Sequence, residues 1–141
     1  MDNTALASAI IARLAQYLPF VAVEDFPDDV NSYYLTHPKG ALLVMYSASA
    51  GDGMKRERAF EVVAVSRGLQ MACKMIEAAR WILERWEPFT GATKFICEGD
   101  QFLQEDSGTW WYGSRFTLTG PPPVVKEADL QSRINQYFNI S

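Results

Sequence analysis

Two strand-like stretches flank a polar turn toward the carboxyl end of the chain, and they constrain the fold more than any other feature. Residues 94–103 and 110–119 lie on either side of the turn 104–109, an arrangement typical of a β-hairpin. Alternate residues of a strand point to opposite faces. In the second stretch, one face carries Trp110, Tyr112, Ser114, Phe116 and Leu118. Such an apolar face needs a core, so we expect the hairpin to belong to a sheet that is covered on one side.

Two amphipathic helices are predicted from the spacing of apolar residues. In residues 4–17 these residues recur every three or four positions, with Asn3 or Thr4 as the expected N-cap. A longer stripe runs through residues 69–86, where Arg80 and Glu84 have i,i+4 spacing on the polar side. Such a pair contributes only about 0.2–0.5 kcal/mol. Packing against the rest of the domain must therefore hold this helix.

Further strands are expected at residues 20–24, 41–46 and 56–66. The run 41–46 is almost continuously apolar, which predicts a central strand buried on both faces. Residues 25–31 suit a loop, because Pro27 and its acidic neighbours favour turns. The stretch 47–53 is small and rich in glycine, and we interpret it as a long flexible loop. Residues 127–138 can form a short helix with apolar residues on one side.

Together these elements predict an α+β fold. It has a mostly antiparallel sheet of about four to five strands, two main helices on one face, and a short C-terminal helix. Residues 1–141 form a single expected domain, since a chain of this length buries roughly 68–70% of its unfolded surface. Residues 120–141 are an extension and a candidate for docking on a neighbouring subunit.

Composition and charge disfavour several classes of partner. The 13 Lys and Arg residues are outnumbered by 17 Asp and Glu residues, whereas nucleic-acid binders usually carry a basic excess. We expect contact with DNA at most in passing, through the lumen of a ring. No apolar run reaches membrane-spanning length and no signal peptide is evident, so we expect a soluble protein that is intracellular when made. Cys73 and Cys97 lack CxxC spacing and are predicted to be free thiols.

The sequence shows no convincing catalytic or cofactor set. His37 is the one histidine, and the following Pro38 holds it in an extended conformation. Zinc would need ligands that one His and two distant Cys cannot supply. The acids Glu24, Asp25, Asp28 and Asp29 lack the spacing of a calcium loop, and residues 47–53 lack the Gly-Lys-Ser/Thr of a phosphate loop. We expect no enzyme, metal or cofactor; the alternative is a small hydrolase or nuclease that uses His37 with acids near Asp25.

Three consecutive aromatic residues, Trp110, Trp111 and Tyr112, are the most unusual local feature. In a strand, Trp111 points away from its neighbours. It is either capped by the C-terminal segment or packed into a subunit interface, where tryptophan is a frequent anchor. Stacking on a nucleic-acid base is a third reading, although basic residues do not surround the site.

Four segments, taken in order, resemble a family of small tail proteins from Mu-like phages and prophages. They span roughly residues 21–119, and the most specific of them contains His-Pro-Lys-Gly. The segments are Glu24-Asp-Phe-Pro27, Tyr33-Tyr-Leu-Thr-His-Pro-Lys-Gly-Ala-Leu-Leu-Val44, Arg58-Ala-Phe-Glu-Val-Val-Ala-Val65, and Glu105-Asp106 followed by Gly108, Trp110 and Tyr112.

The resemblance implies a tail terminator or tail-completion subunit of a contractile-tailed phage. Such proteins have an α+β fold and form hexameric rings that cap the tail tube, stop its polymerisation and offer a docking surface to the head. The implied partners are further copies of the chain, the tail tube and sheath proteins, and a head–tail connector protein. The implied location is the virion tail, with assembly in the bacterial host cytoplasm. No catalytic residue is carried over, and residues 47–55 are shorter and less polar than the corresponding segment of the family.

A ring requires a heterologous interface, in which two different patches of the chain meet. We predict one patch on the hairpin 94–119 and the other on residues 47–57 with the adjoining strand. The candidate interface residues are Trp110, Trp111, Tyr112, Arg115, Tyr46, Ser47, Lys55 and Arg56. The alternative is a monomeric tail-assembly adaptor or chaperone that binds a partner through the same aromatic hairpin.

Overall fold

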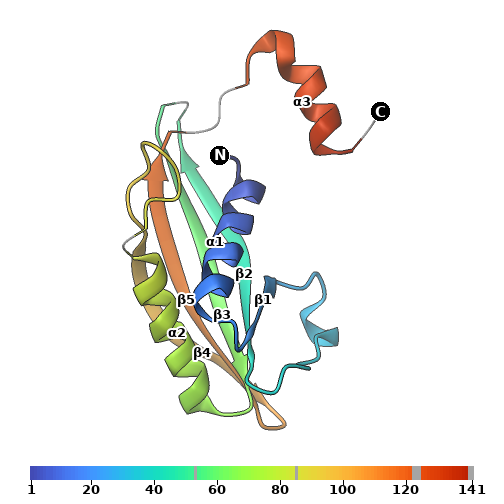
Figure 1. Cartoon of the computed structure of the whole chain (residues 1–141), viewed down its shortest axis with the longest axis vertical. Helices are drawn as coiled ribbons and strands as arrows, with labels where there is room; N and C mark the ends of the chain where they lie inside the picture. Colours follow the sequence, from blue (N-terminus) through green and yellow to red (C-terminus); the bar gives the residue numbers. More distant parts are fainter. Residues whose placement is uncertain (53, 85, 122–124, 140–141) are drawn as a thin grey trace.

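The computed structural model describes residues 1–52, 54–84, 86–121 and 125–139 and has the predicted α+β architecture (Figure 1). The five strands follow the order β1-β2-β3-β5-β4. β1 pairs with β2 in parallel, and the other three pairings are antiparallel. The helices and strands are α1 (Asn3–Tyr17), β1 (Ala22–Asp25), β2 (Ala41–Gly51), β3 (Arg56–Ser66), α2 (Leu69–Leu83), β4 (Ile96–Asp106), β5 (Thr109–Gly120) and α3 (Leu130–Tyr137).

The helices α1 and α2 cover one face of the sheet and form the main core (Figure 1). Leu6, Ile10 and Leu14 of α1 are fully buried against the sheet. α2 contributes Met75 and Ile76 from its apolar stripe. Each such side chain stabilises the fold by roughly 1.5–3 kcal/mol, far more than the half-exposed Arg80–Glu84 pair, whose Nε and Oε1 atoms lie 3.3 Å apart. Packing therefore holds the helices, as the sequence predicts.

A smaller apolar cluster lies on the opposite face of the sheet. Its buried members are Leu35, Ala41, Leu43, Val63, Val65 and Trp111, with Tyr33 packed against them. The strands β2, β3 and β5 supply most of these residues, and the connection between β1 and β2 supplies Tyr33 and Leu35. β2 is thus buried on both faces from Ala41 to Val44, as expected for a central strand.

The prediction of a flexible loop at residues 47–53 is wrong for the described part of that segment; Gly53 lies outside the described residues. β2 continues to Gly51 and pairs with β3 as far as Arg56, with a bulge between Tyr46 and Ala48. The Asp52 carboxylate accepts hydrogen bonds from the backbone N–H groups of Met54 and Lys55 at 2.8 and 2.9 Å, which closes the turn. Backbone pairing with β3 makes this stretch a strand in spite of its small side chains.

Several predicted boundaries also differ from the structure. The hairpin turn is tighter than the predicted 104–109, because β4 continues to Asp106 and β5 begins at Thr109. Asp2 caps α1 instead of Asn3 or Thr4, because its Oδ1 accepts from Ala5 N at 2.7 Å. α2 ends at Leu83, before Trp86, although Trp86 still stacks on Phe95 with ring centroids 5.9 Å apart. The first strand spans Ala22–Asp25 instead of 20–24, since its register is set by pairing with Ala41 to Val44 of β2.

The C-terminal helix lies apart from the sheet and the other helices (Figure 1). A 3-10 turn at Glu127–Asp129 leads into α3, in agreement with the predicted helix at 127–138. None of the residues of α3 is buried. A hydrogen bond between the hydroxyl groups of Tyr137 and Thr4 connects it to the body of the protein. No helix in the described part of the chain combines the length and apolar character that a membrane crossing requires.

Candidate assembly surface

The predicted interface residues are spread along the sheet, with the aromatic group at one end, Lys55 and Arg56 at the other, and Arg115, Tyr46 and Ser47 between them. Trp110 lies beside Ser66 at the end of β3, whereas Arg56 lies at the beginning of β3 beside Gly120. Ten steps along a strand from residue 56 to residue 66 cover about 33 Å at roughly 3.3 Å a step. Lys55 and Arg56 therefore do not meet the aromatic group within one chain.

Arg115 and Ser47 are the predicted interface residues that the structure brings together. Arg115 Nη1 donates to Ser47 Oγ at 3.4 Å, across the intervening strand β3, and Arg115 Nε donates to Glu98 Oε2 at 3.1 Å. Both charged side chains are about two-fifths exposed, so the ion pair contributes roughly 0–1 kcal/mol. These residues lie on the sheet face opposite the helices, where a hollow of about 310 Å³ borders Arg115, Glu98 and Glu61.

The three consecutive aromatics have different environments. Trp110 is partly exposed and packs on Phe102, with ring centroids 5.8 Å apart. Tyr112 packs at the edge of the main core, where burial raises the pKa of its hydroxyl. Trp111 is 7% exposed and lies in the smaller cluster. Tyr33 covers Trp111, and the two rings meet edge-on with their centroids 5.4 Å apart. Burial of Trp111 therefore needs neither the C-terminal segment nor a neighbouring subunit.

The partly buried hydroxyl of Tyr33, which lies near Glu24, makes the stability of the fold depend on pH in the alkaline range. Burial, followed by the nearby Glu24 carboxylate, raises the pKa of Tyr33 from 10.0 to about 12. Above pH 10 the unfolded chain loses this proton while the folded chain keeps it, so stability falls as pH rises toward 12. We expect Tyr33→Phe to make this fall shallower when urea unfolding is measured across that interval. Tyr34→Phe, at a 76% exposed side chain, is the control and should follow the wild-type curve.

Sequence reasoning missed three exposed apolar side chains, one on α2 and two on β4. Trp81 on α2 is 69% exposed, and Phe102 and Leu103 on β4 are also exposed. The position of Trp81 outside the apolar stripe of its helix is a signal that could have identified it. β4 is an edge strand, but bulges near Cys97 and Phe102 interrupt its register, which disfavours pairing with another strand.

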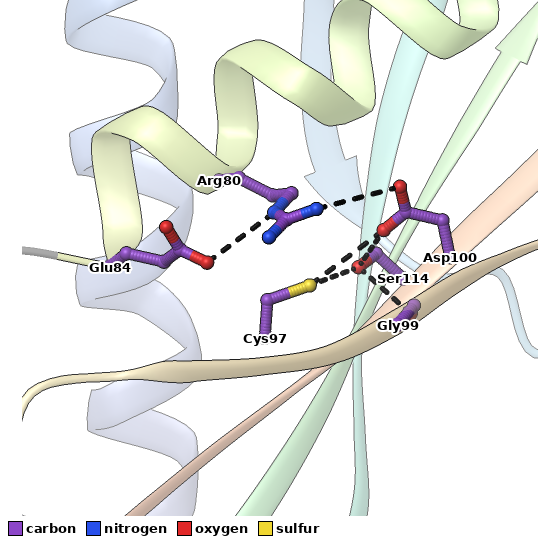
Figure 2. Close-up of polar contacts among 6 residues, drawn as sticks. All are labelled: Arg80, Glu84, Cys97, Gly99, Asp100 and Ser114. Carbon is purple, nitrogen blue, oxygen red and sulfur yellow. Dashed lines mark hydrogen bonds and ion pairs between the residues drawn. The ribbon is translucent and has the colours of Figure 1, made fainter.

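A polar cluster joins α2 to the hairpin β4–β5 (Figure 2). Ser114 Oγ donates to Asp100 Oδ1 at 2.9 Å and lies 3.0 Å from Cys97 Sγ. Arg80 of α2 points between Asp100 and Glu84, at 4.0 and 3.3 Å (Figure 2). The sequence did not predict this cluster, although Ser114 is the one small polar residue on the apolar face of its strand. The contacts attach the hairpin to the helix.

The family can be assigned with this geometry in view. The sequence matches the family described as Gp37 protein over residues 10–137, which is most of the chain. The chain belongs to the Gp37 family. No curated protein sequence matches it. The fold of this Gp37 protein is similar to that of a solved chain from the virion of a native gene transfer agent (GTA) particle, with a TM-score of 0.55 and 13% identity; the match covers 82% of this chain and 93% of that chain.

The single histidine of this Gp37-family chain lies away from the polar cluster. His37 is in the connection before β2, and its Nδ1 accepts from the backbone N–H of Lys39 at 3.2 Å. Two of the acids have local roles: Asp29 caps the short 3-10 helix Val30–Ser32, and Glu24 contacts Tyr33. Cys73 and Cys97 are free thiols. Across the described ranges, no group of three or more His, Cys, Asp or Glu residues is arranged to hold a metal ion.

Proposed function

We propose that this chain is a structural subunit of a phage-type virion, and within it a tail terminator that closes into a ring. The observation that carries the proposal is the fold likeness to a chain of an assembled GTA virion, which extends over 93% of that chain. The resemblance of the segments around His37 and Trp110 to small tail proteins of Mu-like phages supports the more specific role. In this role the protein acts by assembly and not by catalysis.

The distribution of charge supports head-to-tail association. At one end of the sheet, Lys55 in the turn between β2 and β3 and Arg56 at the start of β3 are basic, beside the acidic Asp52 and Glu57. At the opposite end, Glu105 and Asp106 at the end of β4 are acidic, and Arg67 borders the same hollow as Asp106. In the proposed arrangement, Lys55 and Arg56 of one subunit meet Glu105 and Asp106 of the next. An interface between two different patches repeats around a ring when its rotation closes, and rim charges of this kind mainly set orientation and association rate.

The proposed ring, with hexamer as the expected stoichiometry, lies at the head-proximal tip of the tail. There it contacts tail tube and sheath proteins on one side and a head–tail connector protein on the other. DNA passes through its lumen. The subunits are made and assembled in the cytoplasm of the bacterial host and remain in the virion tail.

Deleting the gene from the producing bacterium tests this role. We expect electron microscopy of the lysate to show tails of uncontrolled length, or heads and tails that remain unattached. A plasmid copy of the wild-type gene should restore normal particles, whereas a copy with Lys55→Glu and Arg56→Glu should not. That variant should fold normally, because Lys55 is in an exposed turn and Arg56 is the first residue of β3 and is not buried. Normal virions in the deletion lysate would contradict the terminator role.

The exposed Phe102, which packs on the partly exposed Trp110, favours a second candidate, a monomeric adaptor or chaperone that binds a tail protein through these two aromatic side chains. Phe102→Ala separates the two functions better than a change at the buried Trp111. Loss of a tail partner by an otherwise unchanged monomer would favour the adaptor. Loss of self-association with the fold intact would favour the ring.

A further inference from the structure

The C-terminal arm, which we define as residues 125–139, has an apolar side without a partner. Leu130, Ile134, Tyr137 and Phe138 are all exposed, Phe138 by 66%. α3 has only eight residues, and isolated helices shorter than about 12–15 residues are marginal in water. The arm therefore needs another surface to remain helical, and its own chain supplies little.

A hollow of about 290 Å³ between α1 and β2 can receive such an arm. Thr4 and Ser8 of α1 line one side, and Phe26, Met45 and Tyr46 line the other. The parallel pairing of β1 with β2 stops at Asp25 and Val44. From Met45 onward, no described strand covers that edge of β2. Both apolar side chains and free backbone groups therefore face an incoming segment.

An unpaired acceptor marks the same hollow. The side-chain oxygen of Asn3, which also lines the hollow, is buried and has no hydrogen-bond partner among the described residues. A buried acceptor without a donor costs roughly 1–3 kcal/mol. A segment that fills the hollow and brings a donor would remove this cost.

The arm touches the rim of the hollow of its own chain and does not enter it. The contact is the hydrogen bond between the hydroxyls of Tyr137 and Thr4. In this position the four apolar side chains of the arm stay exposed, so the arm gains almost no burial from its own chain. The contact nevertheless holds the arm next to the hollow, where two copies could exchange their arms.

We infer that the arm of one copy docks in the α1–β2 hollow of the next copy, with Ile134 and Phe138 packed against Phe26, Met45 and Tyr46. The charges agree with this occupant. Arg133 of the arm and Asp25 beside the hollow are both without an ion-pair partner among the described residues, and they have opposite signs. The exchange deepens the ring proposal and rests on it, because each copy gives one arm and receives another.

Mixing two assembly-deficient variants tests the exchange. The full-length arm variant carries Ile134→Glu and Phe138→Glu, and the hollow variant carries Ser8→Arg at an exposed position of α1. We expect the association of each variant alone to weaken by about 100-fold or more, since docked apolar side chains are lost. Native mass spectrometry of the equimolar mixture should then show a heterodimer, because the intact arm of the hollow variant fits the intact hollow of the arm variant.

The matched control is Ser132→Glu, on the polar side of the arm, which should assemble like the wild-type chain. Unchanged urea unfolding midpoints would show that all variants fold. Undiminished assembly of the arm variant, a mixture without heterodimer, or a wild-type chain that is monomeric at every accessible concentration would each overturn the exchange. None of these outcomes decides the terminator role, which the gene deletion tests separately. Normal virions in the deletion lysate would reject that role even if arms exchange.

Discussion

Replacing Trp111 with alanine is expected to lower the free energy of unfolding by about 3–5 kcal/mol. Trp111 is 7% exposed and fills the smaller cluster between Leu43, Val63 and Val65 of the sheet and the connection that precedes β2. Its removal leaves a cavity under Tyr33, whose ring centroid lies 5.4 Å from that of Trp111. The face opposite the helices would lose its largest side chain and the connection its main anchor.

Urea unfolding followed by circular dichroism measures this loss, with Trp81→Ala as the control for removal of an indole. Trp81 is 69% exposed, so its replacement should change stability by no more than about 0.5 kcal/mol. In thermal unfolding, the Trp111 variant should melt roughly 6–20 °C lower. If Trp111→Ala unfolds like the control and instead loses self-association, then Trp111 is an interface anchor and its cover by Tyr33 does not describe the protein in solution.

The elements that sequence predicted well are those whose pattern is local. The apolar spacing in α1 and α2 and the alternation in β5 each identify a face, and residues 41–46 identify a strand buried on both sides. The second half of β2 escaped prediction because Ser47 to Gly51 has neither large side chains nor alternation. Its strand conformation comes from hydrogen bonding to β3, which is not encoded within the segment itself.

The candidate assembly surface was harder to predict, because it depends on the register of the strands and on contacts between residues that are far apart in the sequence. Sequence alternation placed Trp111 opposite Trp110, but it could not identify Tyr33 as the residue that covers it. Arg115 and Ser47 meet across β3, and only the register of three strands brings them together. The same register places Lys55 and Arg56 at the opposite end of the sheet from the aromatic group, so these parts of the two predicted patches stay apart within one chain.

Substitution of Arg58 is expected to have the second large effect, because this residue is a buried charge with no carboxylate partner among the described residues. The residue is 1% exposed. Its Nη1 donates to the backbone oxygen of Met1 at 2.6 Å, whereas Nη2 has no hydrogen-bond partner among the described residues. The guanidinium lies 5.4 Å from the centre of the Phe89 ring. Burial and the nearby Arg56 hold its pKa below the usual value, yet an arginine remains charged.

Two substitutions separate the packing of Arg58 from its charge. Arg58→Met keeps an unbranched stem and removes the unpaired charge, so we expect stability to be unchanged or to rise by as much as about 1–4 kcal/mol. Arg58→Ala also removes the stem and should cost roughly 2–5 kcal/mol through the cavity it leaves beside Phe89. Urea unfolding of both variants against the wild-type chain measures the contrast. A methionine variant as unstable as the alanine variant would show that the guanidinium charge itself stabilises the junction between the N-terminus and β3.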